Sequence, residues 1–98
     1  MIKVKKLEFI IYKPHLSKFL EILDKQSISG YTIINDVLGK GSTGVLSWSE
    51  VTDSFKKVYI FTLCEEEKLK EIIDNVNPFF KKFGGIFFVT DSYISERK

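Results

Sequence analysis

Apolar residues recur along the chain with two different spacings, and these predict four strands and two helices. Alternating or continuous apolar residues, many of them β-branched or aromatic, predict strands over residues 4–12, 31–37, 57–63 and 86–89. A spacing of three and four residues predicts two amphipathic helices between them. Their apolar stripes consist of Leu16, Phe19, Leu20 and Leu23 in the first helix and of Leu69, Ile72, Ile73, Val76 and Phe80 in the second.

Proline, glycine and acidic residues mark the ends of these elements. Pro14 suits the first turn of the first helix, and Gly30 follows that helix as a turn residue. Residues 65–67 are glutamates at the start of the second helix, where the helix dipole favours negative charge. Pro78 lies within the second helical pattern, so we expect the helix to end or kink there.

The resulting order, β-α-β-β-α-β, is that of a ferredoxin-like α+β fold, in which two helices cover one face of an antiparallel sheet. Gly84 and Gly85 separate the second helix from the last strand, and residues 93–98 are expected to form a short tail. Residues 9–12 and 86–89 are apolar at almost every position. On a sheet with one uncovered face they would expose apolar surface, which usually marks association. The pattern therefore predicts a sheet that associates with copies of itself.

A glycine-rich loop, Gly39-Lys40-Gly41-Ser42-Thr43-Gly44, follows the second strand. Glycines allow backbone N–H groups to form a concave anion site. Lys40 adds a cation, and Ser42 and Thr43 add hydroxyl donors. These features favour a phosphate-binding loop. Short glycine motifs are weak signals, so a glycine-rich turn without a ligand remains the alternative.

The segment from Leu38 to Lys56 is too long for a hairpin turn, and long loops in compact domains are usually functional. Ser47 and Glu50 have the spacing of a capping box, which predicts a short helix over residues 48–55. That helix would present three apolar side chains on one side, those of Trp48, Val51 and Phe55. Trp48 either anchors the segment on its own domain or contacts a partner, as tryptophan often does at interfaces.

Composition excludes several other kinds of site. The 98 residues carry 15 basic and 13 acidic side chains, and the net charge of +2 does not favour nucleic-acid binding. Cys64 and His15 are the single cysteine and histidine. They allow no intrachain disulfide, no thiolate metal cluster and no catalytic pair at a recognisable spacing. No apolar run is long enough to span a membrane and the N-terminus is not a signal peptide, so we expect a cytoplasmic, non-enzymatic protein.

Taken together, the motifs resemble those of the PII-like signalling proteins. Gly30-Tyr31-Thr32 leads to Gly39-Lys40-Gly41-Ser42, Trp48-Ser49 lies in the long loop, and Gly85-Ile86-Phe87 opens the last strand. The resemblance covers nearly the whole chain and implies a single PII-like domain over residues 1–98, with residues 38–56 as its T-loop. It is closest to short-loop members linked to inorganic carbon, including regulators of a bicarbonate transporter and carboxysome-associated proteins.

The resemblance implies a homotrimer with an adenine nucleotide in the clefts between subunits. It also implies a T-loop that docks on a partner, such as the cytosolic surface of a bicarbonate transporter or a carboxysome component. The implied nucleotide-binding residues are Thr32, Gly39, Lys40, Gly41, Ser42, Thr43, Gly85, Ile86 and Phe87. The implied partner contacts are Trp48, Val51 and Phe55.

The chain departs from the nitrogen-sensing members of this family. Gly85 stands where they carry a lysine, and residues 38–56 contain neither the tyrosine nor the glutamine of their T-loop. Both differences disfavour ATP with 2-oxoglutarate and favour AMP, ADP or cyclic AMP as the effector. Thr43 stands where transporter-linked relatives have an arginine that helps to hold phosphate. We therefore expect a lower affinity for a mononucleotide.

Two other functions remain open. The first is a generic ferredoxin-like regulatory or oligomerisation domain that binds no nucleotide. The second is an RNA-binding module, because the RRM fold has the same order of elements. The second is disfavoured, since the aromatic run over residues 86–89 lies on the fourth strand, whereas the RRM motif belongs on the third.

Overall fold

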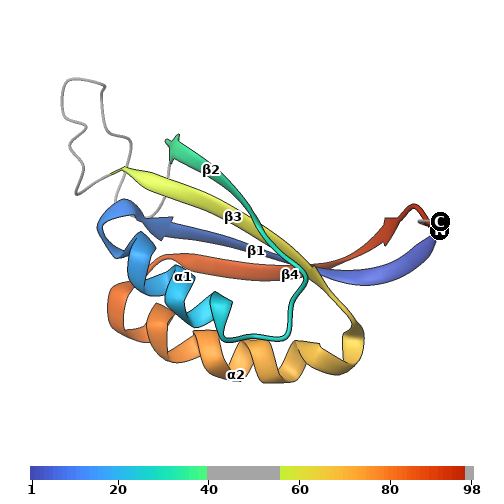
Figure 1. Ribbon diagram of the computed structural model, residues 1–98. Helices are drawn as coiled ribbons and strands as arrows, with labels where there is room; N and C mark the ends of the chain where they lie inside the picture. Colours follow the sequence, from blue (N-terminus) through green and yellow to red (C-terminus); the bar gives the residue numbers. More distant parts are fainter. Residues whose placement is uncertain (40–55, 97–98) are drawn as a thin grey trace.

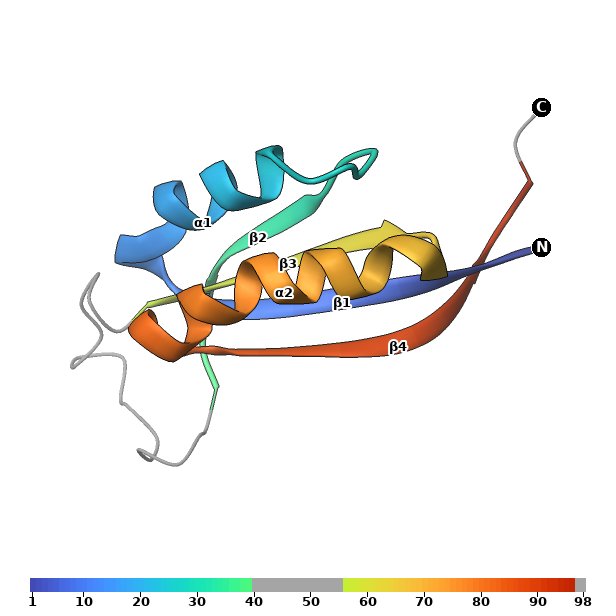
Figure 2. The same cartoon turned by 90° about the horizontal axis from the view of Figure 1, so that it is seen from below.

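The computed structural model describes residues 1–39 and 56–96, which form a four-stranded antiparallel sheet with two helices on one face (Figure 1). The elements are β1 (Ile2–Tyr12), a 3-10 turn (Lys13–His15), α1 (Leu16–Asp24), β2 (Thr32–Val37), β3 (Lys57–Cys64), α2 (Glu66–Phe83) and β4 (Ile86–Ile94). The strand order is β2-β3-β1-β4, and each neighbouring pair is antiparallel. Figure 2 shows both helices in front of the sheet. The predicted ferredoxin-like arrangement is confirmed.

The hydrophobic core lies between the helices and one face of the sheet. Alternate residues of β1 and β3 point into it and are buried, namely Leu7, Phe9, Ile11, Val58, Ile60 and Thr62. The helices contribute the buried residues Phe19, Leu23, Ile72, Val76 and Phe79. One predicted core position needs correction, because Phe79 is buried whereas Phe80 is only partly buried. Both follow Val76 at helical spacing and both rings contact Phe19, but Phe80 lies closer to Phe87 at the edge of the sheet.

Helix α2 continues through Pro78 to Phe83, so of the two expected outcomes, an end or a kink, the end at Pro78 is wrong. Pro78 is exposed. The rings of Phe79 and Phe80 beyond it pack on Phe19, with ring centroids 5.0 and 5.6 Å away. Burial of these rings outweighs the single backbone hydrogen bond that proline removes.

β1 and β4 extend past β3 as a two-stranded arm. Residues 2–4 pair with residues 92–94, whereas β3 ends at Cys64, opposite Lys5. The predicted tail at residue 93 is therefore wrong, because this pairing continues β4 to Ile94. At the base of the arm, Lys5 Nζ lies 2.6 Å from Asp91 Oδ1 and 3.6 Å from Glu66 Oε1. The hydrogen bond with Asp91 raises the pKa of Lys5 and lowers the pKa of Asp91.

The sheet face that points away from the helices, here called the open face, is largely apolar. Its central residues are Lys6, Glu8 and Ile10 of β1, Ile34 of β2, Tyr59 and Phe61 of β3, and Ile86 and Phe88 of β4. Ile34, Ile86 and Phe88 are 51%, 57% and 41% exposed. The prediction of strands that are apolar on both faces is therefore confirmed.

Candidate functional site

Two of the predicted nucleotide-binding residues, Thr32 and Gly39, lie at the two ends of the edge strand β2. Thr32 opens the strand and lines a shallow hollow of about 170 Å³ with residues 29–31 and 61–63. Ligand pockets usually measure ~300–1,000 Å³, so this hollow is too small to be a whole site. Gly39 follows the other end of β2, a six-residue strand whose pairing is irregular between Ile34 and Val37. A ligand that contacts both residues must be elongated.

The remaining predicted residues of the site divide into two groups. Lys40, Gly41, Ser42 and Thr43 lie outside the described residues. Ile86 and Phe87 open β4, directly after Gly85, and β4 is the opposite edge strand of the sheet from β2. Three strand spacings of ~4.8 Å separate the two edges, a distance of roughly 14 Å. One chain therefore cannot place Thr32 and the start of β4 against the same adenine ring, and a site with both needs two copies of the chain.

The turn from α2 into β4 allows no side chain at Gly85. Gly84 and Gly85 have φ angles of 77° and 91°, in the region that favours glycine. A Cβ on Gly85 would stand 2.6 Å from the carbonyl oxygen of Ile10. The absence of a lysine at this position is therefore required by the backbone. The start of β4 offers a phosphate no cationic side chain at Gly85.

The two residues after Gly85 point to opposite faces of the sheet. Ile86 is 57% exposed on the open face. The ring of Phe87 packs in the core, with its centroid 4.9 Å from that of Phe80 and 6.1 Å from that of Phe9. The side chain of Ile86 is therefore accessible to a ligand, whereas the ring of Phe87 is engaged in the core.

Sequence reasoning missed the anchor at the base of the long loop. The ammonium group of Lys13 donates a 3.0 Å hydrogen bond to Asp36 Oδ1 and lowers the pKa of that carboxyl group. The backbone N–H of Lys13 donates to the carbonyl oxygen of Lys56, at 2.9 Å. Asp36 itself has a φ of 58°, in the left-handed region. One turn thus holds the chain on both sides of residues 40–55. Contacts between residues so far apart in sequence leave no local pattern to read.

Other chemistry is sparse in the part of the chain that the structure describes. Over residues 1–39 and 56–96, no group of three or more His, Cys, Asp or Glu side chains could hold a metal ion. The ring of His15 packs against Phe83, with centroids 4.4 Å apart. Cys64 is buried, and this burial raises the pKa of its thiol. No helix in these same ranges is both long and apolar enough to cross a membrane. The predicted contacts Trp48, Val51 and Phe55, and the helix predicted over 48–55, lie outside the described residues.

Comparison with known families agrees with this fold. The family model described as nitrogen regulatory protein P-II matches residues 4–97. This chain belongs to the PII family. The resemblance seen in the motifs is therefore confirmed. No curated protein matches the sequence significantly.

Solved structures similar to this PII chain include one of a protein bound to adenine nucleotides. CPII from Thiomonas intermedia, a nitrogen regulatory PII-like protein bound to ADP, AMP and bicarbonate, matches with 28% identity and a TM-score of 0.81, over 96% of this chain and 90% of that chain. The apo form of CPII matches with 25% identity and a TM-score of 0.77, over 97% and 95% of the two chains. The GlnK–ATP complex of B. subtilis shares the fold, with 17% identity and a TM-score of 0.66 over 94% and 84%.

Proposed function

We propose that this PII chain is a non-enzymatic signalling protein that binds an adenine nucleotide between copies of itself. In this proposal residues 1–98 form one domain, three copies form the assembly, and the protein works in the cytoplasm. AMP, ADP or cyclic AMP is the effector. Residues 38–56 act as the T-loop and contact the regulated protein, which we take to be an inorganic-carbon transporter or a carboxysome component.

The position of Thr32 and Gly85 on opposite edges of the sheet carries this proposal. Each edge of one chain holds half of the predicted contacts, so a complete site arises only where β2 of one copy meets β4 of another. The exposed apolar open face supplies the driving force for association, because apolar surface of this kind is unfavourable in water. The generic domain without a nucleotide remains the competing function.

The preference for few phosphates follows from the charges around the site. Gly85 cannot be replaced by a cationic residue without a backbone clash, so Lys40 is the main cation proposed for phosphate. Each additional phosphate adds negative charge that needs a partner. CPII, at 28% identity, is seen with ADP, AMP and bicarbonate, which supports the same choice of ligands for this chain.

Calorimetric titration with AMP, ADP, cyclic AMP and ATP, each with and without bicarbonate, tests the proposal. We expect AMP, ADP or cyclic AMP to bind more tightly than ATP and to be recovered unchanged. Light scattering on the same samples should give the mass of a trimer. A trimer that releases no heat with any nucleotide would support the generic domain instead, and a clear preference for ATP would refute the proposed effector.

The T-loop part of the proposal has its own readout. Trp48 is the single tryptophan, so its fluorescence reports on residues 38–56 alone. Saturating nucleotide should change this emission. The reason is that a ligand at Gly39 favours whichever conformation of the segment fits the occupied site better. Unchanged emission together with unchanged proteolysis of the segment would show that it does not respond to the nucleotide.

A further inference from the structure

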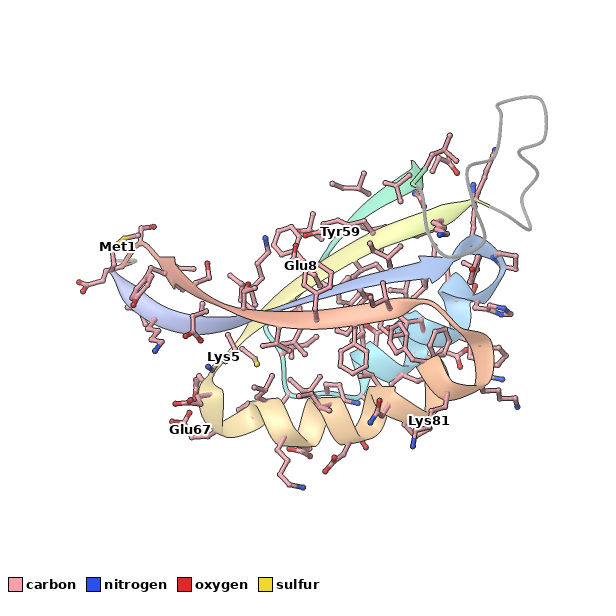
Figure 3. The ribbon with its side chains drawn as sticks, turned by 180° about the vertical axis from the view of Figure 1, so that it is seen from behind. Met1, Lys5, Glu8, Tyr59, Glu67 and Lys81 are labelled. Atoms are coloured by element: carbon pink, nitrogen blue, oxygen red, sulfur yellow. The ribbon has the colours of Figure 1, made fainter. Side chains whose placement is uncertain are left out.

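The open face carries one charged cluster in the middle of its apolar surface. The Tyr59 hydroxyl donates a 2.6 Å hydrogen bond to Glu8 Oε1, and Lys6 Nζ lies 3.6 Å from the same oxygen. Figure 3 shows Glu8 and Tyr59 close together on the side of the sheet away from the helices. Lys6 Nζ also lies 4.9 Å from the centre of the Phe61 ring. The neighbours of the cluster on β1 and β4 are Ile10, Ile86 and Phe88.

Both charges of this cluster keep unused bonding capacity within the described chain. A carboxylate has about four acceptor positions and an ammonium group has three donors. The contacts of Glu8 to described residues both involve Oε1, so Oε2 can still accept a hydrogen bond. Lys6 lies within ion-pair distance of Glu8 but beyond the length of a good hydrogen bond. The side chains of Lys6 and Glu8 are 31% and 16% exposed, so a covering surface would bury them almost completely.

We infer that Lys6 of one copy pairs with Glu8 of the neighbouring copy and thereby fixes how the open faces align. This rests on the proposed self-association. Apolar contacts are non-directional and accept many alignments. Covering the face removes water from Glu8 Oε2 and from the remaining donors of Lys6, which is costly unless new partners replace it, so alignments that join Lys6 to Glu8 of the next copy are favoured. The face presents a donor and an acceptor two residues apart on β1, and this makes it complementary to an identical face rather than to an unrelated protein.

This alignment also decides whether the nucleotide site forms. The site needs β2 of one copy beside β4 of another, and both strands are held in the same rigid sheet as Lys6 and Glu8. A slipped contact between open faces would bury similar apolar area but would separate Thr32 from the start of β4. The Lys6–Glu8 pair therefore acts as a positioning element for the nucleotide site, without touching the nucleotide.

Charge reversal in two separate chains tests this inference. Lys6→Glu gives a chain with two acidic residues at these positions, and Glu8→Lys gives a chain with two basic ones. Native mass spectrometry and nucleotide titration are run on the wild type, on each variant alone and on an equal mixture. A matched control is Lys70→Glu, the same charge change at an 89% exposed side chain of α2. Circular dichroism checks that every variant is folded.

We expect each variant alone to associate about tenfold more weakly or worse, because like charges then meet across the contact. In a trimer that contains both chains, two of the three contacts join opposite charges and one joins like charges, so the mixture should recover part of the lost association and nucleotide binding, and Lys70→Glu should behave as the wild type. A role confined to one chain could not be rescued by mixing. A wild-type trimer with no rescue in the mixture, or reversed variants that remain trimeric with unchanged affinity, would overturn the inference alone. A monomeric wild type would overturn the proposed function as well.

If a reversed variant does not fold, the milder substitutions Glu8→Gln and Lys6→Met test the inference instead. Glu8→Gln retains the shape of the side chain and can still accept from Tyr59, but it loses the charge. We expect about a threefold to tenfold weaker association in each folded variant, from the loss of one charge-assisted contact. Unchanged association in both would count against the inference.

Discussion

The backbone of Gly85 lies so close to Ile10 that a Cβ at Gly85 would stand 2.6 Å from the Ile10 carbonyl oxygen. This contact lies where β4 begins its pairing with β1, since Ile10 is opposite Ile86 in the register. It joins the turn after α2 to a central strand of the sheet. The start of the last strand, which is one half of the proposed nucleotide site, is therefore held rigidly by the packing of the backbone.

Gly85→Ala should destabilise the fold by about 2 kcal/mol or more, because a side chain there meets backbone and also has to adopt a positive φ. Chemical unfolding followed by circular dichroism measures this loss. Gly30→Ala is the matched control, since a Cβ at Gly30 meets nothing within 4 Å. That control should change the free energy of unfolding by no more than ~1 kcal/mol. Equal effects of the two substitutions would contradict the tight approach of Gly85 to Ile10.

Pro78→Ala should stabilise the chain by about 1–3 kcal/mol, because alanine restores an N–H donor and removes a ring from the interior of α2. Pro78 is exposed, so the change removes no core contact. A rise in the midpoint of thermal unfolding checks this expectation. A lower midpoint would mean that the rigid φ of Pro78 limits the unfolded chain more than the missing hydrogen bond costs the folded one.

The order of elements and the core stripes could be predicted from sequence, because hydrophobic periodicity reports which side of each element is covered. The aromatic rings of Phe9 and Phe19 are an example, because both lie on predicted core positions and pack together with their centroids 4.9 Å apart. The course of α2 through Pro78 could not be predicted, since local propensity favours a break and only tertiary burial of Phe79 overrides it. Local patterns are weak evidence where a distant contact decides the outcome.

In the candidate site, too, local patterns predict some features and distant contacts decide others. Gly84 and Gly85 indicated a break between the second helix and the last strand, and the structure has it there, whereas the close approach of Gly85 to Ile10 follows from tertiary packing. The anchor between Lys13 and Asp36 has no sequence signature, because it joins residues on different elements. The separation of Thr32 from Gly85 depends on the strand order, which the sequence implies only through the fold family.

Stability at high pH should depend on Tyr59. Burial, and then the hydrogen bond to Glu8, raise the pKa of Tyr59 from 10.0 to about 12. Below pH 10 the phenol is neutral in both the folded and the unfolded chain, so its contribution is fully present. As pH rises from 10 toward 12, the unfolded chain loses the proton first and the free energy of unfolding falls.

Unfolding free energies at about pH 9 and about pH 11 measure this loss, and Tyr59→Phe should show a smaller fall than the wild type because it has no phenol to ionise at this position. Absorbance of the phenolate gives an independent reading, in which Tyr59 titrates after an ordinary tyrosine. An equal fall in both proteins would contradict the raised pKa.

Lys40→Ala tests the proposed role of Lys40 as the cation that binds the phosphate of the nucleotide. If Lys40 holds phosphate, the substitution should weaken binding of AMP and ADP about tenfold or more, since a charge-assisted hydrogen bond contributes ~1.5–3 kcal/mol. Adenosine carries no phosphate, so its affinity should not change. Lys70→Ala is the matched control, because it removes the same charge from an 89% exposed side chain of α2. Equal weakening of AMP and adenosine would show that Lys40 supports the loop rather than the phosphate. Unchanged affinity for every ligand would move the phosphate contact to the backbone of residues 39–43.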